Sequence, residues 1–303
     1  MRIVAALGGN ALLRRGQRPD ADVQEHNVAV AVASLAPLAM RHELVITHGN
    51  GPQVGLLALE SAADHSLTRP YPLAELGAET QGLIGYWLLQ ELQNSLPGRD
   101  VAALVTQTVV ADDDPAFDSP TKFVGPVYPS EAEAADVGRR MAWIMRPDGV
   151  AWRRVVASPR PLRIVEELVV ARLLDEGVVV ICAGGGGIPV VVDAGGRRRG
   201  VDAVIDKDLT TALLAENLRA DALLLLTDAD GVIDGWGTPE ATVMRSVTTS
   251  ELRARRFLAG SMGPKVDAAC LFVERTGKRA AIGALGRAEA VLSGESGTTV
   301  RPD

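Results

Sequence analysis

Two lysines occupy positions where helix electrostatics do not favour a cation. Asp206 is a favoured N-cap residue and places Lys207 and Asp208 in the first turn of a helix. Lys265 follows Pro264, and proline is common at the first helical position. A cation in the first turn opposes the helix dipole by about 0.3–1 kcal/mol, so the matched pair favours an anion bound between two helix ends. The alternative is that both lysine side chains extend into solvent.

Glycine-bearing loops that could hold the phosphate part of such an anion follow several apolar segments. Glycine lets the backbone approach a ligand where a side chain would obstruct it, and Pro52 suits the first position of a helix whose free N–H groups face the loop. One such loop alone could be an ordinary tight turn, but the repetition favours anion binding. The residues concerned are Gly8, Gly9 and Asn10, then Gly49, Asn50 and Gly51, and then Gly185 and Gly186 within the run 184–187.

The better-known phosphate-binding motifs do not fit. The run 184–187 lacks the third glycine of the dinucleotide fingerprint, because Pro189 or Val190 stands there. The pair Gly277 and Lys278 is followed by Arg279 and lacks the earlier glycine of a Walker loop. Neither His-Arg-Asp nor Asp-Phe-Gly occurs, which excludes protein-kinase machinery. Taken together, the loops and lysines indicate phosphoryl transfer by different machinery.

These residues are positioned by alternating apolar segments and segments with helical periodicity. This alternation predicts an α/β fold with a mostly parallel sheet covered by helices. The expected strands are Ile3–Leu7, Leu44–Thr47, Val101–Val110, Val178–Ala183 and Leu223–Thr227. The expected helices are Val23–Met40, Leu73–Leu96, Arg163–Glu176, Asp206–Leu218 and Pro264–Thr276. Residues 294–303 are expected to be a frayed end or a short edge strand.

The segment 111–161 interrupts the alternation. It is rich in Asp and Pro, contains a helical patch at Glu131–Met141 and carries the aromatic residues Trp143 and Trp152. We expect an inserted subdomain that leaves one edge of the sheet, returns to it and covers the substrate as a flap.

The composition of the chain limits the classes of partner that it could bind. The 303 residues carry a net charge of −7, from 31 basic and 38 acidic residues mixed along the chain, which argues against nucleic acid and membrane surfaces. The longest uncharged stretch, 177–192, is interrupted by glycines and a proline and is too short to span a bilayer. The start of the chain lacks a convincing signal peptide, so we expect a cytoplasmic protein. Cys182 and Cys270 lack a paired spacing and are expected to be core thiols.

With these residues assembled, the chain resembles the amino-acid kinase family and, within it, the carbamate kinase family. The resemblance extends from the N-terminus to beyond residue 280. It is carried by the segments 6–12, 47–55, 120–122, 152–156, 184–189, 204–208 and 261–265, of which those around Gly49 and Lys207 are the most specific.

The resemblance implies a single domain over residues 1–303, built as a three-layer αβα sandwich with an open, mostly parallel sheet and a small protruding subdomain. It also implies the reversible reaction ATP + carbamate = ADP + carbamoyl phosphate with Mg²⁺, in a homodimer. The reaction would make ATP from carbamoyl phosphate in arginine or purine nitrogen catabolism.

The resemblance further assigns roles to individual residues. Lys122, Lys207 and Lys265 would stabilise the phosphates, Asp208 would hold the lysines or orient Mg²⁺, and the glycine loops would embrace carbamate and the transferred group. Thr227, Asp228, Asp230, Met262 and Gly263 would lie beside the nucleotide.

The chain departs from the wider family at a few positions. Ala6 stands where many relatives have a lysine, and Lys122 from the insertion would replace that charge, which favours carbamate over acetylglutamate as the acceptor. Phe123, Ile233 and Thr80 also differ from the usual pattern without removing a charged group. Two alternatives stay open: a kinase of another small carboxylate, such as acetylglutamate, or of a phosphonate, and a binding protein that retains the fold without turnover.

Overall fold

The computed structural model describes residues 1–14, 16–257 and 262–303, without the side chain of Asn10. In this part of the chain, the main sheet has eight strands and is parallel except at the pair β16–β17. The strands lie in the order β15 (Ser246–Thr248), β17 (Thr298–Arg301), β16 (Arg279–Ala284), β12 (Ala222–Thr227), β1 (Arg2–Leu7), β2 (Glu43–His48), β9 (Val179–Ile181) and β3 (Val101–Ala103).

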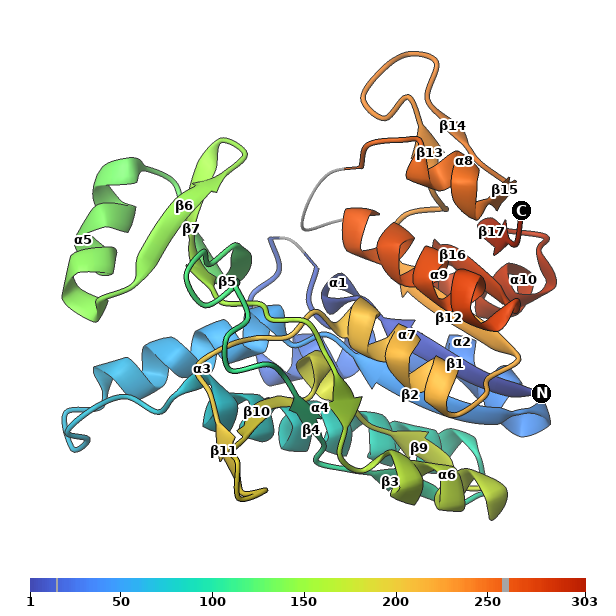
Figure 1. Ribbon diagram of the computed structural model, residues 1–303, viewed down its shortest axis with the longest axis horizontal. Helices are drawn as coiled ribbons and strands as arrows, with labels where there is room; N and C mark the ends of the chain where they lie inside the picture. The colour runs from blue at the N-terminus through green and yellow to red at the C-terminus, as the bar shows by residue number, and fades with distance from the viewer. Residues whose placement is uncertain (15, 258–261) are drawn as a thin grey trace.

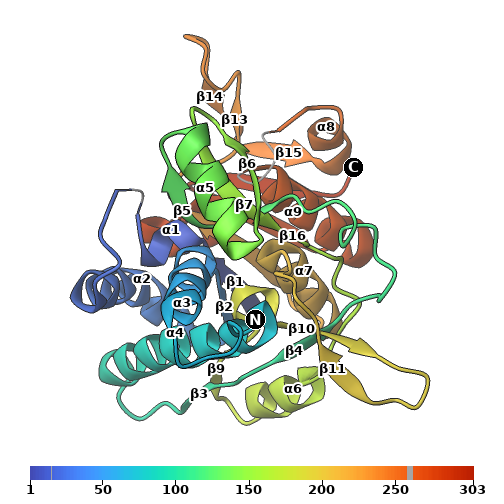
Figure 2. The same cartoon turned by 90° about the vertical axis from the view of Figure 1, so that its left-hand side faces the viewer.

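Helices cover both faces of this sheet (Figures 1 and 2). Strand β1 shows why, because Val4 and Ala6 are buried in one hydrophobic core and Ile3, Ala5 and Leu7 in the other. The first core is completed by α6 (Glu167–Asp175), α7 (Lys207–Asn217) and α9 (Met262–Thr276), and the second by α2 (Ala21–Arg41), α4 (Leu73–Ser95) and α10 (Ala288–Ser293). The predicted α/β fold with a mostly parallel sheet between helix layers is confirmed.

Shorter strands and helices lie outside the eight-stranded sheet and its two helix layers. A four-stranded sheet has the order β11, β10, β4, β8, and a two-stranded hairpin joins β13 and β14. Their bounds are β4 (Gln107–Val109), β8 (Arg163–Ile164), β10 (Ile188–Val192), β11 (Arg198–Gly200), β13 (Ile233–Asp234) and β14 (Thr242–Val243). The other helices outside the segment 111–161 are α1 (Gly9–Leu12), α3 (Gly51–Ala63), α8 (Thr249–Arg253), η1 (Gly184–Gly186) and η2 (Leu285–Arg287).

The segment 111–161 contains a separate antiparallel sheet of β5 (Lys122–Tyr128), β7 (Ala151–Val156) and β6 (Ile144–Asp148), with α5 (Glu131–Met141) packed on it. Tyr128, Ala134 and Val137 form a small core of its own. Figure 1 shows α5, β6 and β7 projecting away from the main sheet. The segment starts after β4 and ends before β8, and these two strands pair with each other.

Three predicted elements were wrong in detail. The expected strand Val101–Val110 is two strands in different sheets, β3 and β4. The chain turns between them, where the backbone N–H of Thr106 donates to Gln81 Oε1 (2.8 Å). Arg163–Ile164 forms β8, so the helix expected from residue 163 begins at Glu167. The C-terminal strand β17 is not at an edge, because β15 pairs with its outer side.

No helix in the described residues is long and apolar enough to cross a membrane.

Candidate functional site

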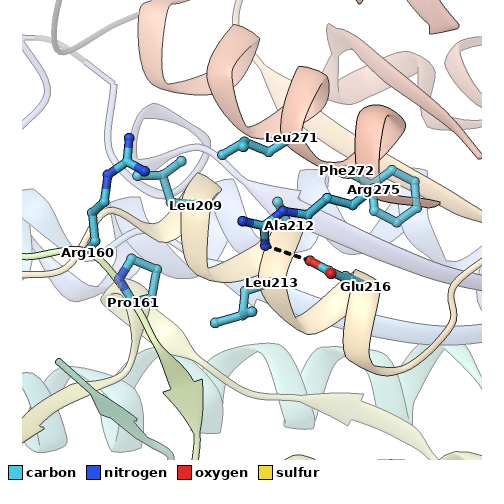
Figure 3. A pocket seen from close by; sticks show the side chains of 9 residues that line it. All are labelled: Arg160, Pro161, Leu209, Ala212, Leu213, Glu216, Leu271, Phe272 and Arg275. Carbon is cyan, nitrogen blue, oxygen red and sulfur yellow. Dashed lines mark hydrogen bonds and ion pairs between the residues drawn. The ribbon is translucent and has the colours of Figure 1, made fainter. Parts of the chain in front are cut away.

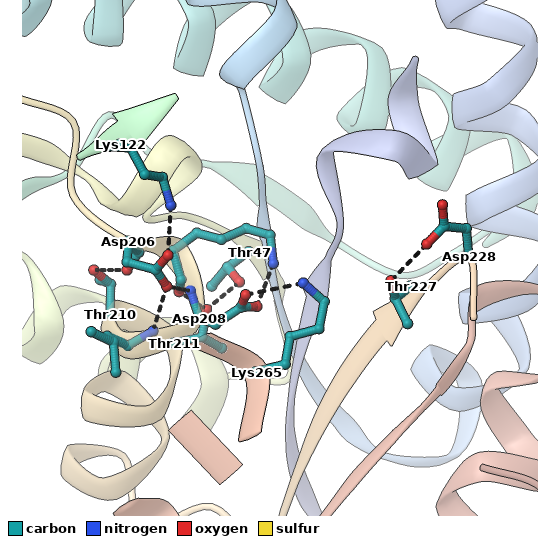
Figure 4. A network of polar contacts seen from close by, with 11 residues as sticks. Thr47, Lys122, Asp206, Asp208, Thr210, Thr211, Thr227, Asp228 and Lys265 are labelled. Atoms are coloured by element: carbon teal, nitrogen blue, oxygen red, sulfur yellow. Dashed lines mark hydrogen bonds and ion pairs between the residues drawn. The ribbon is translucent and has the colours of Figure 1, made fainter. Parts of the chain in front are cut away.

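Asp208 joins two of the predicted lysines at the centre of the candidate site (Figure 4). Lys207 Nζ donates to its Oδ1 atom, and Lys265 Nζ lies 3.2 Å from its Oδ2 atom. The side chain of Asp208 is only 5% exposed. The helices α7 and α9, which carry the lysines, pack against each other and thereby bring two distant segments of the chain to one carboxylate.

The third lysine, Lys122, reaches the same place from the protruding sheet. Its Nζ atom lies 2.5 Å from Oδ2 of Asp206. The other carboxylate oxygen of Asp206 accepts hydrogen bonds from the backbone N–H groups of Asp208 (2.9 Å) and Leu209 (3.2 Å). Asp206 is therefore the N-cap that the sequence predicts, and it holds an additional contact that the sequence does not predict.

Burial and charge set the protonation of this cluster. Burial raises the pKa of Asp208, but the ammonium groups of Lys207 and Lys265 outweigh it and hold that pKa well below its usual range. Burial lowers the pKa of Lys207, and nearby Lys265 lowers it further, while Asp208 acts in the opposite direction. Ammonium groups with so little access to solvent need a charged partner, and Asp208 is that partner for Lys207 and Lys265. A polyanion bound here would therefore meet ammonium groups that are already oriented.

The first two glycine loops touch each other and Lys207. A Cβ atom on Gly49 would lie 2.9 Å from the backbone nitrogen of Gly9 and 3.4 Å from Cε of Lys207. The backbone N–H of Gly8 donates to Leu226 O, and that of Gly49 to Leu7 O, both at 3.0 Å. These bonds continue the parallel ladders of β1 beyond its end, so both loops meet at the carboxyl edge of the sheet, where open α/β sheets bind ligands.

Helix α3 begins at Gly51, one residue before the expected Pro52, with Asn50 as its N-cap residue. Asn10, the remaining member of the first loop, belongs to α1 with its side chain outside the described part.

The third loop closes against the second. Gly185 has a φ of +64°, and a Cβ atom there would overlap the side chain of Asn50. Asn50 Nδ2 donates to Thr80 Oγ1 (2.9 Å), so the Thr80 hydroxyl orients the Asn50 side chain of the second loop. The carbonyl oxygen of Gly186 accepts hydrogen bonds from the hydroxyls of Thr108 (2.9 Å) and Thr210 (3.0 Å). These two bonds attach the third loop to β4 and α7.

His48, which precedes Gly49, is buried beside Lys207 and beneath Gly184. Burial is the main cause that lowers its pKa to about 4, the positive charge of Lys207 contributes in the same direction, and the contact of Nδ1 with the carbonyl of Gly49 acts against them. His48 is therefore neutral near pH 7 and leaves the charge of the site to the lysines.

The predicted nucleotide-binding residues lie at the ends of two elements. Thr227 ends β12, and its hydroxyl donates to Asp228 Oδ1 (3.0 Å). Figure 4 shows this pair to one side of the lysine cluster. Asp230 is exposed in the following loop, and Met262 and Gly263 belong to the N-terminal part of α9. Ser261, which precedes these two residues in the sequence, lies outside the described residues. Their role in nucleotide binding stays a prediction.

Sequence reasoning missed the threonines that support the cluster. Thr211 donates to the carbonyl oxygen of Lys207 (2.6 Å), and Thr47 Oγ1 lies 2.7 Å from Thr211 Oγ1. These buried hydroxyls fix the first turn of α7 against the end of β2. Threonine is favoured in strands and disfavoured inside helices, and neither preference predicts a contact between residues so far apart in the sequence.

A separate cavity lies between α7, α9 and the segment 160–161 (Figure 3). The ion pair of Arg275 with Glu216 (2.9 Å) lies at this cavity. None of the predicted site residues lines it, so it is distinct from the lysine cluster.

Comparison with known proteins agrees with this geometry. The model of the amino acid kinase family matches residues 1–284, and the chain belongs to this family.

Carbamate kinase of Rhizobium meliloti (strain 1021) is 52% identical to it, and the match covers 99% of this chain and 93% of that protein. Carbamate kinase of Escherichia coli (strain K12) is 50% identical, with 98% of each chain covered. The structure of carbamate kinase from Giardia lamblia bound to AMP-PNP is 41% identical, with a TM-score of 0.90 and coverage of 100% of this chain and 98% of that chain. Within the amino acid kinase family, the chain belongs to the carbamate kinases.

Proposed function

We propose that the protein catalyses the reversible reaction ATP + carbamate = ADP + carbamoyl phosphate. The observation that carries this proposal is the convergence of Lys122, Lys207 and Lys265 on the pair Asp206 and Asp208, in a chain about half identical to carbamate kinases over nearly its full length. Two carboxylates do not neutralise three ammonium groups, which leaves positive charge for a phosphoryl group in transfer.

Phosphoryl transfer requires mainly positioning and charge stabilisation from the protein. A carbamate oxygen attacks the γ-phosphorus in line while the bond from that phosphorus to the bridging oxygen of ADP breaks. Carbamate is already an anion, so no general base is needed. Lys207 and Lys265 stabilise the charge on the equatorial oxygens, and backbone N–H groups of the first two glycine loops, other than those of Gly8 and Gly49, hold the transferred group.

Lys122 would serve the acceptor side of the reaction. It comes from the protruding sheet, while Ala6 in β1 offers no charge beneath the first loop. The glycine loops provide few side chains that could contact a larger acceptor. This arrangement supports carbamate over acetylglutamate, and it supports a role for the segment 111–161 as a flap over the acceptor.

ATP and ADP would bind at the ends of β12 and α9, with Mg²⁺ carried by the nucleotide phosphates. The described residues contain no group of three His, Cys, Asp or Glu side chains arranged to hold a metal ion. Both oxygens of Asp208 contact lysines, so its fit is to ammonium groups rather than to Mg²⁺. The chemistry that Mg²⁺ supplies is charge neutralisation on the β- and γ-phosphates.

The direct test supplies ADP, Mg²⁺ and carbamoyl phosphate and measures the ATP formed. ATP formation is expected, and its absence would refute the proposal. ATP-dependent phosphorylation of acetylglutamate or of a phosphonate would favour the alternative kinases, and nucleotide binding without turnover would favour a binding protein. A homodimer, a cytoplasmic location and a role in arginine or purine nitrogen catabolism remain predictions.

A further inference from the structure

We propose that Asp206 is a positioning residue that fixes the Lys122 ammonium group on the acceptor side of the candidate site by tying the protruding sheet to α7. The inference rests on the proposed function. Its basis is that the two oxygens of one carboxylate face different parts of the molecule: Oδ1 accepts from the backbone of α7, and Oδ2 contacts Lys122 Nζ at 2.5 Å.

This contact matters because Lys122 does not belong to the main sheet. It begins β5, whose sheet packs with α5 around the separate core of Tyr128, Ala134 and Val137. The placement of its ammonium group relative to Lys207 therefore depends on contacts that cross between the two bodies. Asp206 provides a charged one, directly at the turn that carries Lys207 and Asp208.

The ion pair is well suited to this task. The side chain of Asp206 is 12% exposed and that of Lys122 is 29% exposed, so the pair is only partly screened by water. The capping bonds hold the carboxylate in one orientation, because Oδ1 is fixed by two N–H groups of the helix. Lys122 can then meet Oδ2 only in one region of space, next to the lysines that would bind the phosphates.

The two jobs of Asp206 can be separated with a single substitution. Asn and Asp are similarly good N-cap residues, so Asp206→Asn retains an oxygen for the N–H groups of α7. It replaces the second oxygen by an NH₂ group, which cannot accept from an ammonium donor. The variant thus keeps the helix cap and removes the tie to Lys122.

The experiment compares the wild type, Asp206→Asn, Lys122→Ala and the double variant in ATP formation from ADP and carbamoyl phosphate. We expect kcat to fall on the order of 10²-fold in Asp206→Asn, the loss typical of a misplaced reacting group, with KM for ADP unchanged. In the Lys122→Ala background the second change should cost nothing further. An equal loss in both backgrounds, or no loss in either, would overturn the proposal.

Asp202→Asn is the matched control. Asp202 is exposed, and its Oδ1 atom accepts from the backbone N–H of Leu73 at the start of α4 (2.9 Å), so it also contacts a helix N-terminus but lies outside the lysine cluster. This variant should retain kcat. Thermal unfolding of Asp206→Asn close to that of the wild type shows that the loss of kcat is not a loss of folding.

A second readout separates this proposal from the reaction itself. Hydrogen exchange of the β5 amides should increase in Asp206→Asn and in Lys122→Ala to the same extent, with no further increase in the double variant. If the wild type makes no ATP, the proposed function fails while the exchange result still decides whether Asp206 holds β5. Unchanged exchange in both single variants would refute the tie.

Discussion

The backbones of Gly55 in α3 and Gly125 in β5 cross in direct contact. A Cβ atom on Gly55 would overlap the Cα atom of Gly125, and one on Gly125 would lie 3.3 Å from the Cα atom of Gly55. Gly125 also has a φ of +74°, which favours glycine. Helix α3, which follows the second glycine loop, therefore packs directly against β5, the strand that begins with Lys122.

Gly55→Ala should displace β5 from α3. Overpacking of this kind costs about 1–3 kcal/mol in the free energy of unfolding, and the shift of Lys122 should also lower kcat. Urea unfolding and ATP formation measure the two effects. Gly82→Ala in α4 is the matched control, because a Cβ atom there meets nothing within 4 Å. A Gly55→Ala protein with the stability and kcat of the control would contradict this close crossing of α3 and β5.

Lys265→Ala should lower kcat on the order of 10²–10³-fold, because it removes one of the cations proposed to face the transferred phosphoryl group. The rate of ATP formation at saturating ADP and carbamoyl phosphate measures kcat. Lys278→Ala, whose side chain is 53% exposed and lies 3.9 Å from Asp221, is the control and should retain activity. Near wild-type rates in Lys265→Ala would show that the site is misassigned.

Asp208→Asn should be strongly destabilising. It leaves the buried ammonium group of Lys207 and the partly buried one of Lys265 without their carboxylate, and removing one partner of a buried ion pair costs about 3–5 kcal/mol. Urea unfolding measures the free energy. Asp267→Asn, which loses an exposed contact with Arg253, should cost less than about 1 kcal/mol. Equal costs in the two variants would be incompatible with a charge-bearing cluster.

His48 should make stability fall with decreasing pH. Its pKa is about 4 in the folded protein against 6.5 for the free side chain, so below pH 6.5 the unfolded chain binds a proton that the folded protein does not. The stabilisation is present above pH 6.5, falls by about 2 kcal/mol by pH 5 and is fully lost below about pH 4.

Urea unfolding of the wild type and of His48→Gln at pH 7.5 and pH 5 tests this directly. The difference in unfolding free energy between the two proteins should change with pH by that amount. Parallel pH dependence of both proteins would exclude the titration.

Much of the fold could be predicted because its signals are local. The apolar residues of β1 and the spacing of Val28, Val32 and Leu35 in α2 mark a central strand and an amphipathic helix. The break in the expected strand Val101–Val110 could not be predicted. It depends on the contact of Thr106 with Gln81 in α4, and no local pattern encodes that pairing.

The candidate site, like the fold, has features that could be predicted from the sequence and features that could not. The first-turn lysines and the Asp206 cap follow from helix chemistry within a few residues, and the structure places Lys207 and Lys265 on one carboxylate. The second contact of Asp206, with Lys122, joins residues distant in the sequence and could not be predicted from it. The same holds for the pair Thr47 and Thr211.

The close packing of Gly185 on Asn50 has a consequence for the order of folding. Asn50 follows β2 and Gly185 follows β9, two strands that are far apart in the chain, and the two loops are in direct contact. Bringing together two residues separated by so long a stretch of chain is entropically costly and slow, so this contact forms after the local helices. During refolding from urea, recovery of enzymatic activity should therefore lag behind recovery of helical circular dichroism.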